Sequence, residues 1–529
     1  DLETKTGRDL GTPGSGGGAP LSRGKNAARW AVLAVFLAAC LYIAWKVPYT
    51  HDDWDWGLPV GVERLVTAGL NSRYGGTALV LAMTRSQLMK TLVMGAGMFL
   101  IPWLAARLTT EDAGERAVWT AAGGAALFSM PMVSWQQTFG WVSAFANFVA
   151  GAAVMLGVLL LWQKTFSKKS EHPLPLAGAL FVLCLAGQLF AENQTLALTG
   201  AGVVTGAYAL VSRRGRLPAL AGLAGCVLGA LLMFGNPLYG QLAASGTAVE
   251  GVRSLVFEPG QGLGSMAATV AERLFTVVLP GLFEYYPGVC LLVSAGCLWR
   301  LHQRGVRWYW QVLLGLWSAL YCAQCWVVME HIRQLDSWQC PWQPVRVAGA
   351  VIQLILLLAV VVWEGGEKGN ARLLLLLAAV GMLAPFAVVK DYGARCVFPS
   401  AAALLVLGLS LAKGMETKRW VQGLVLVTLA LSVGFHVRAY RLIGQAEWIR
   451  QNQMAQAVAN GDSSVMLPTE GWDLSYSWGR NPQSQVRADY FRAFYHLPED
   501  MELIFLPPGS AEQWPQISEQ MLQAAQRFS

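Results

Sequence analysis

Long apolar runs alternate with short polar breaks along most of the chain. Each run is close to the ~20 apolar residues that a helix needs to cross a bilayer. The pattern predicts an all-α polytopic membrane protein with about thirteen transmembrane helices. The expected spans are residues 30–45, 87–106, 117–133, 142–162, 175–190, 195–212, 217–234, 265–299, 308–329, 347–363, 373–389, 396–412 and 420–437. Charged residues interrupt 265–299, so an interfacial helix followed by a short span is the alternative for that run.

The two ends of the chain differ from the apolar middle. Residues 1–28 are polar and rich in Gly, Ser and Pro, which is typical of a disordered tail. Residues 29–437 form the expected transmembrane domain. From residue 438 to 529 the long apolar runs disappear, which predicts a small α/β or helical C-terminal domain.

Composition supports a membrane protein and weakens other classes. Hydrophobic residues make up 54% of the chain and charged residues only 13%, whereas soluble domains carry about 25% charged residues. The net charge of +7 comes from basic clusters beside the apolar runs, which orient helices and do not indicate nucleic-acid binding. No Walker loop, GxGxxG fingerprint, HExxH motif or nucleophile elbow occurs, which argues against nucleotide-driven or hydrolytic chemistry.

Basic residues gather in alternate breaks between the predicted spans. The positive-inside rule places these breaks, together with the tail, in the cytoplasm. The basic residues are Arg107, Arg116, Lys164, Lys168, Lys169, Arg213, Arg214, Arg216, Arg300, Arg304, Arg307, Lys368, Arg372, Lys413, Lys418 and Arg419. The other breaks hold most of the unusual acids and amides, so we expect a polar site on the extracytoplasmic face. With an odd number of spans, the C-terminal domain lies on that face too.

The first outer loop, residues 47–86, begins with the sequence His-Asp-Asp-Trp-Asp-Trp-Gly at positions 51–57. Asp52, Asp53 and Asp55 place three carboxylates within four positions, directly after the first span. Acids at this depth are costly unless water, a cation or a substrate receives them. Asp52 and Asp53 are the candidates for a general base, because adjacent carboxylates and partial desolvation raise pKa values. The structural alternative is that these acids cap the following helix.

Further polar candidates follow in the same set of outer breaks. Asn71 and Arg73 end the first loop, where Arg73 is a phosphate ligand or a structural salt-bridge partner. Asn147 lies inside a span and serves either a ligand or helix–helix hydrogen bonding. Glu192 and Asn193 form a carboxylate–amide pair that would bind an acceptor sugar or a divalent cation, Mg²⁺ or Mn²⁺.

The later outer breaks add candidates for the same pocket. Arg395 is the preferred phosphate ligand, because guanidinium binds phosphate oxygens in a bidentate fashion; snorkelling is its alternative. Arg253 is a second candidate for phosphate. Asn236, His331 and Asp391 are candidate substrate-binding residues, and one His with dispersed acids does not predict a metal site.

The order of these motifs resembles the GT-C class of polytopic glycosyltransferases, and more narrowly a bacterial glucosyltransferase-like membrane family. The resemblance rests on an ordered set: Asp52, Asp53, Asn71, Arg73, Trp135 to Gly140, Asn147, Glu192, Asn193, Gly235, Asn236 and Arg395. It covers most of the spanning region but not the C-terminal domain. It implies an inverting transferase in the cell membrane that uses a polyprenyl-phosphate sugar donor, with an Asp base in the first outer loop.

Three functions remain open on the sequence. The first is transfer of a sugar from a polyprenyl-phosphate donor to an envelope glycan, teichoic acid or lipid acceptor. The second is transport or flipping of a lipid-linked saccharide, which the shortage of charge at span centres disfavours. The third is an envelope polysaccharide polymerase or ligase with a pyrophosphate-linked donor.

Overall fold

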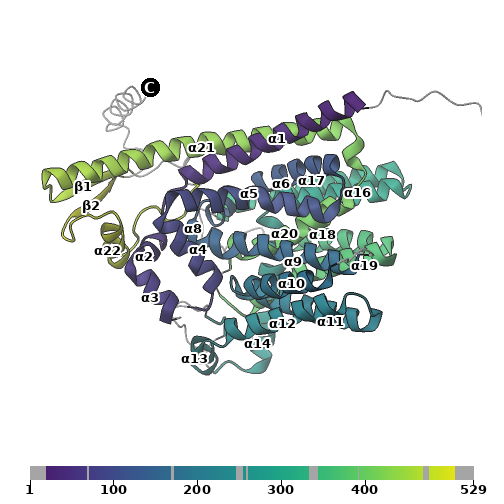
Figure 1. The fold of residues 1–529 in the computed structure, drawn as a ribbon, viewed down its shortest axis with the longest axis horizontal. Helices are drawn as coiled ribbons and strands as arrows, with labels where there is room; N and C mark the ends of the chain where they lie inside the picture. The colour runs from purple at the N-terminus through teal and green to yellow at the C-terminus, as the bar shows by residue number, and fades with distance from the viewer. Residues whose placement is uncertain are drawn as a thin grey trace, which may run out of the picture.

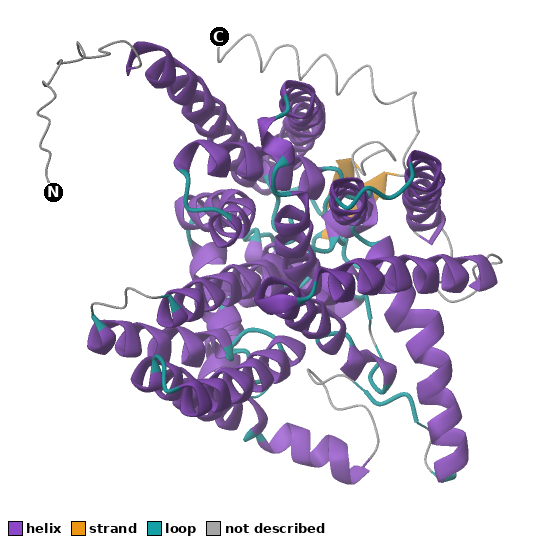
Figure 2. Ribbon diagram, turned by 90° about the vertical axis from the view of Figure 1, so that its right-hand side faces the viewer, coloured by secondary structure: helices purple, strands orange, loops and turns teal. Residues whose placement is uncertain are grey.

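The computed structural model describes residues 19–67, 69, 71–167, 172–245, 254–257, 260–332, 343–390, 392–468 and 476–506. Most of this part is helical, and the helices form one bundle with a small two-stranded region at one end (Figures 1 and 2). Most of the predicted tail, residues 1–18, lies outside the described residues, and the first helix begins at Ala19.

The first half of the chain supplies the helices around the acidic loop. They are α1 (Ala19–Lys46), α2 (Asp53–Gly57), α3 (Pro59–Thr67), α4 (Tyr74–Arg85), α5 (Gln87–Thr109), α6 (Ala113–Phe128), α7 (Met132–Gln136), α8 (Val142–Ala144), the π-helix η1 (Phe145–Val149), α9 (Ala150–Phe166), α10 (Pro173–Gly187), α11 (Glu192–Ser212), α12 (Arg216–Phe234) and α13 (Pro237–Ser245).

The second half completes the bundle and adds the strands. Its elements are α14 (Leu263–Arg273), η2 (Leu274–Val278), α15 (Leu279–Glu284), α16 (Pro287–Gln303), α17 (Trp308–Ile332), α18 (Gln343–Glu364), α19 (Gly366–Gly381), η3 (Ala384–Ala387), α20 (Ala394–Ala412), η4 (Met415–Thr417), α21 (Arg419–Asn460), β1 (Ser464–Pro468), α22 (Gln485–Phe494) and β2 (Glu502–Leu506).

Eleven helices in the described part of the chain are long and apolar enough to cross a membrane. The prediction of a polytopic helical membrane protein is therefore confirmed, and eleven of the expected spans coincide with helices of this length. Two predicted spans correspond to shorter helices, α6 with 16 residues and α10 with 15. At 1.5 Å per residue these helices are only about 22–24 Å long, short of the ~30 Å hydrocarbon core.

The ambiguous run at 265–299 contains two helical segments. The first, Leu263–Glu284, joins α14, η2 and α15 and is long and apolar enough to be a candidate span. Pro287 lacks a backbone N–H and sits in the first turn of the 17-residue α16, which is where a helix tolerates proline. The chain therefore breaks at Tyr285–Tyr286, between the two helices.

The two sets of loops lie at opposite ends of the bundle. At one end, Arg300 and Arg372 donate hydrogen bonds to the carbonyl of Ser410. The basic breaks that hold Arg300 and Arg372 therefore lie beside the basic break that follows α20. At the other end lie α2, α3, α22 and the strands (Figure 1). The helix α20 is almost completely buried between its neighbours, and its N-terminus carries Arg395.

The last candidate span, α21, does not end where the predicted C-terminal domain begins. Residue 438 falls within α21, which runs for 42 residues until Gly461 adopts a left-handed conformation with φ +72°. A helix of this length is about 63 Å long, roughly twice the hydrocarbon thickness, so its far end lies beyond the membrane. There β1 and β2 pair in parallel, with Ser464 opposite Glu502 and α22 between them in sequence.

The C-terminal region shares its core with the acidic loop. Trp54 is fully buried among Met454, Val465, Leu467 and Phe491, and its indole meets the Phe491 ring edge to face at 5.1 Å. The loop is therefore packed between the helix bundle and the C-terminal region.

Gly140 marks the closest approach of the bundle to the C-terminal region. A Cβ added at Gly140 would lie 1.9 Å from the backbone oxygen of Tyr476. We expect Gly140→Ala to lower the unfolding free energy by about 1–3 kcal/mol, because both backbones must shift. Gly157→Ala is the matched control, since nothing lies within 4 Å of a Cβ there. Thermal unfolding of both variants in detergent tests this expectation; equal midpoints would contradict it.

Candidate functional site

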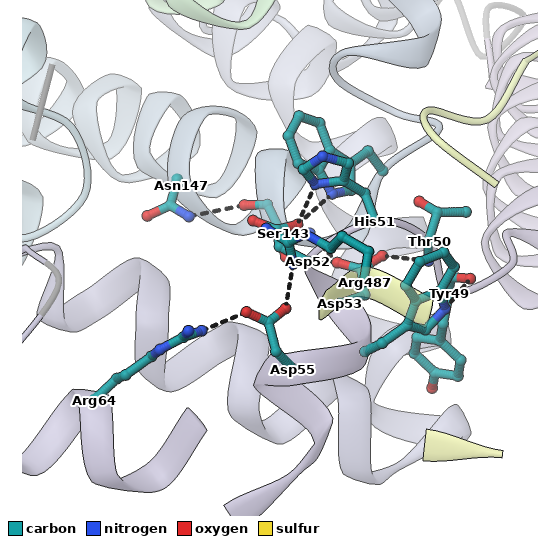
Figure 3. A network of polar contacts seen from close by, with 12 residues as sticks. Tyr49, Thr50, His51, Asp52, Asp53, Asp55, Arg64, Ser143, Asn147 and Arg487 are labelled. Carbon is teal, nitrogen blue, oxygen red and sulfur yellow. Dashed lines mark hydrogen bonds and ion pairs between the residues drawn. The ribbon is translucent and has the colours of Figure 1, made fainter. Parts of the chain in front are cut away.

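Asp53 is held by three hydrogen bonds from two segments of the chain. Its Oδ2 accepts from the backbone N–H of Thr50 at 2.9 Å. Its Oδ1 accepts from the backbone N–H of Ser143 at 2.9 Å and from the Ser143 hydroxyl at 2.5 Å (Figure 3). The residue is fully buried. Asp53 therefore joins the acidic loop to α8 and has no exposed surface for a substrate.

Asp52 faces outward beside it. Its Oδ1 accepts a hydrogen bond from Nε1 of Trp141 at 2.8 Å, and Nδ1 of His51 lies 3.8 Å away. The side chain keeps 26% of its surface exposed. His51 adopts a left-handed backbone conformation with φ +52°, which is uncommon for a residue with a side chain. Of the two adjacent carboxylates, Asp52 is the one that solvent or a substrate can reach.

The environment separates the two carboxylates electrostatically. Burial and the charge of Asp52 raise the pKa of Asp53 to about 8, although the hydrogen bonds from Ser143 and Thr50 oppose this shift. Burial works against ionisation of Asp52 too, but His51, Arg487 and the Trp141 hydrogen bond lower the pKa of Asp52 below its ordinary value. Near neutral pH the pair therefore carries one negative charge, which resides on Asp52.

Asp55 is a structural ion-pair partner in this geometry. Its Oδ1 accepts a hydrogen bond from Nη1 of Arg487 in α22 at 2.8 Å, and its Oδ2 accepts one from Nη1 of Arg64 in α3 (Figure 3). Burial raises the pKa of Asp55, and the two guanidinium groups oppose that effect. Its carboxylate connects α2 with α3 and with the C-terminal region.

Trp141 brings Arg395 to the surroundings of Asp52. The Arg395 guanidinium lies over the Trp141 ring at 5.4 Å from its centroid. The same indole meets the His51 ring edge to face at 5.5 Å and stacks nearly parallel on Trp478 at 5.7 Å. A carboxylate, a guanidinium, an imidazole and a second indole thus surround one buried tryptophan.

Arg73 and Glu192 form a bidentate ion pair between α4 and α11. Nε and Nη2 of Arg73 donate to the two carboxylate oxygens of Glu192 at 3.0 and 2.9 Å. The hydroxyl of Tyr239 also donates to Glu192 at 3.0 Å, and Asn71 accepts from the backbone N–H of Arg73 at 3.0 Å. Asn71 therefore shapes the backbone at Arg73, and both oxygens of Glu192 are occupied.

The remaining amides bind mainly to the protein backbone. Asn147 donates to the carbonyl of Ser143 at 2.8 Å, while its Oδ1 is buried with no hydrogen-bond partner among the described residues. Asn193 donates to the carbonyl of Cys396 at 3.1 Å, which ties α11 to α20. The Oδ1 of Asn236 accepts from the backbone N–H of Leu238 at 2.9 Å at the start of α13. Asn193 and Asn236 thus stabilise the positions of helix ends.

For three candidates, the side chain lies outside the described residues. Arg253 and Asp391 lie outside the described residues. The backbone of His331 belongs to α17, but its side chain is likewise outside the described part. Within the described residues, no group of three His, Cys, Asp or Glu side chains could hold a metal ion. A divalent cation at Glu192 would have to compete with Arg73 and Tyr239.

Sequence reasoning missed several residues that build the site. Ser143 and Trp478 had no signal of their own, and Trp141 only follows the motif from Trp135 to Gly140. Lys90 offered a signal, because a lysine inside an apolar run rarely faces lipid. Its Nζ donates to the carbonyl of Val47 and lies 4.4 Å from the Tyr49 ring centroid, at the base of the acidic loop.

The raised pKa of Asp53 predicts a pH-dependent stability. The folded-state pKa of about 8 exceeds the ordinary value of 3.8, so the stability contributed by the protonated acid is complete below pH 3.8 and is lost as pH rises through about 8. Asp53→Asn removes this titration. Thermal midpoints between about pH 5 and pH 9 should fall more steeply for the wild type than for the variant. Parallel curves would refute the raised pKa.

The Arg73–Glu192 pair predicts strong coupling between two variants. Arg73→Gln or Glu192→Gln leaves one charged partner without its counter-ion, so each should lower the unfolding free energy by about 1–3 kcal/mol. The double variant should lose less than the sum, because no unpaired charge remains. Thermal unfolding of the four proteins completes the double-mutant cycle. Additive losses would mean that the ion pair contributes little.

Comparisons with known proteins add no family assignment. No protein-family model, curated protein or solved structure matches the chain. The resemblance to the GT-C class therefore depends on the order of the motifs, and function must be inferred from the residues that surround Asp52.

Proposed function

We propose that the chain is a membrane glycosyltransferase that transfers a sugar from a polyprenyl-phosphate donor to a hydroxyl of a cell-envelope glycan, teichoic acid or lipid. The observation that carries the proposal is that a partly exposed Asp52 and the Arg395 guanidinium both contact the Trp141 indole. Glycosyl transfer needs both charges near one another, a base for the acceptor and a cation for the departing phosphate.

In the proposed reaction, Asp52 accepts the proton of the acceptor hydroxyl as the hydroxyl oxygen attacks the anomeric carbon. The new bond forms as the bond between that carbon and the phosphate oxygen breaks, so the configuration inverts. The polyprenyl phosphate leaves with the bonding electron pair. Asp53 contacts no substrate in this scheme; its hydrogen bonds to Thr50 and Ser143 position the neighbouring Asp52.

Arg395 is the preferred ligand for the phosphate. It is partly exposed in the first turn of α20, a 19-residue helix whose N-terminal N–H groups favour an anion at the same place. Arg73 is the weaker candidate, because Glu192 already neutralises it. We therefore assign Arg73 to holding α4 against α11 beside the site.

The position of the site suits a lipid-linked donor. The acidic loop follows directly after α1, a candidate span that ends at Lys46, and it lies at the end of the bundle away from the basic loops. The donor phosphate would lie at headgroup depth, with its prenyl chain between the helices. By the positive-inside rule this end faces the outside of the cell, which supports an extracytoplasmic reaction.

Transport of a lipid-linked saccharide is the competing function, and polymerisation or ligation with a pyrophosphate donor is another. The buried Glu284–Arg346 pair, with 2.7 Å between Nη2 and Oε2, is the kind of group that transporters carry within spans. It joins the end of α15 to the start of α18, so it ties helix termini together and does not occupy the centre of a span. We therefore favour the transferase.

Asp52→Asn tests the proposal directly. The purified variant in nanodiscs, supplied with polyprenyl-phosphate glucose and envelope lipids, should transfer sugar about 10²–10⁴-fold more slowly, because the amide cannot accept the proton. Asp500→Asn is the matched control, since Asp500 is exposed in a turn of the C-terminal region. Wild-type turnover by Asp52→Asn, or a wild type that moves labelled lipid between leaflets without forming a glycosidic bond, would overturn the assignment.

A further inference from the structure

The C-terminal region contacts the acidic loop at three places. The backbone N–H of His51 donates to the carbonyl of Gly479 at 3.2 Å. Arg487 pairs with Asp55 at 2.8 Å, and the Trp54 indole fills the core of the C-terminal region. A region that served only as an appended domain would not need contacts on both sides of Asp52.

His51 and Gly479 lie in close backbone contact, since a Cβ at Gly479 would lie 3.1 Å from the Cβ of His51. Both have positive φ angles, +52° for His51 and +54° for Gly479. Glycine adopts this conformation readily, but it is uncommon for a residue with a Cβ. At His51 it persists because the surrounding structure enforces it. The loop and the C-terminal region are therefore built to hold each other in this arrangement.

The contact places a partly exposed aromatic face beside Asp52. Trp141 is only 7% exposed, whereas Trp478, stacked on it at an interplanar angle of 15°, remains partly exposed. The His51 side chain keeps 30% of its surface. An open indole next to a carboxylate and an imidazole suits a pyranose ring: the apolar C–H face of the sugar packs on the indole, and its hydroxyls reach the polar groups.

We propose that Trp478 is a binding residue for the sugar of the acceptor, so that the C-terminal region completes the acceptor subsite beside Asp52. The inference rests on the proposed glycosyl transfer, in which the acceptor hydroxyl must lie against Asp52. Trp478 is assigned to the acceptor because it follows α21 in the C-terminal region, whereas Arg395, the proposed ligand of the donor phosphate, begins a helix inside the bundle.

The test measures sugar binding separately from transfer. Full-length protein in nanodiscs is mixed with methyl β-glucoside, maltotriose or cellotriose, and saturation-transfer NMR reports which sugar protons contact the protein. The wild type should bind at least one of these probes. Trp478→Ala should weaken that binding about fivefold or more, and Trp478→Phe should retain most of it. Trp448→Ala, which removes an indole that is 39% exposed on α21, is the matched control.

The outcomes separate a binding role from a structural one. Unchanged binding by Trp478→Ala, or no binding of any probe to the wild type, would overturn the proposal. A lower thermal midpoint with unchanged binding would mean that Trp478 only attaches the C-terminal region. A weaker affinity for polyprenyl-phosphate glucose alone would assign Trp478 to the donor and also overturn it.

Asp52→Asn separates this inference from the proposed function. It should keep the saturation-transfer signal, because the amide still hydrogen-bonds to a hydroxyl, but lose transfer. If the wild type binds the probes through Trp478 but transfers no sugar, the glycosyltransferase proposal fails while the binding site stands. If Asp52→Asn abolishes transfer but Trp478→Ala changes neither binding nor transfer, only the acceptor subsite fails.

Discussion

The site depends on satisfying the hydrogen bonds of a fully buried carboxyl group, that of Asp53. A buried acid is costly without hydrogen-bond partners, and Asp53 obtains them from the backbone of its own loop and from both polar groups of Ser143. Because α8 follows the aromatic segment that ends at Trp141, the same contacts that satisfy Asp53 bring the Trp141 indole to Asp52. One buried group thus fixes the position of its partly exposed neighbour.

The transmembrane architecture was largely predictable, because the cost of exposing polar groups to lipid is expressed directly in hydropathy. The helices α6 and α10, with 16 and 15 residues, are shorter than the other predicted spans. Hydropathy reports burial but does not distinguish lipid from protein as the apolar surroundings. Sequence patterns could not predict that β1 pairs in parallel with β2, because the two strands lie 34 or more residues apart.

Within the site, sequence reasoning found the charged groups but not their partners. Asp52, Asp53, Arg73, Glu192 and Arg395 stood out because ionisable residues beside apolar runs are unusual. Which of them neutralise one another depends on tertiary contacts, such as the pairing of Arg73 with Glu192 across 119 positions. Ser143, Trp141 and Trp478 are ordinary residues in a membrane protein, and only the folded chain gives them a role. Asp52 and Asp53 are identical, adjacent residues, so the sequence could not show that their environments differ.

The two longest helices, α1 and α21, both lead into the site and pack side by side. The acidic loop continues from α1, Trp478 follows α21, and these helices pack against each other along the bundle (Figure 1). Hydrophobic mismatch with a thicker or thinner bilayer is relieved by helix tilt. Since α1 and α21 are packed together, such a tilt moves both in the same direction, preserving the spacing between Asp52 and Trp478 while altering their depth below the headgroups. In the proposed reaction, lipid composition would thereby determine how readily a membrane-embedded donor meets an acceptor that arrives from the aqueous side.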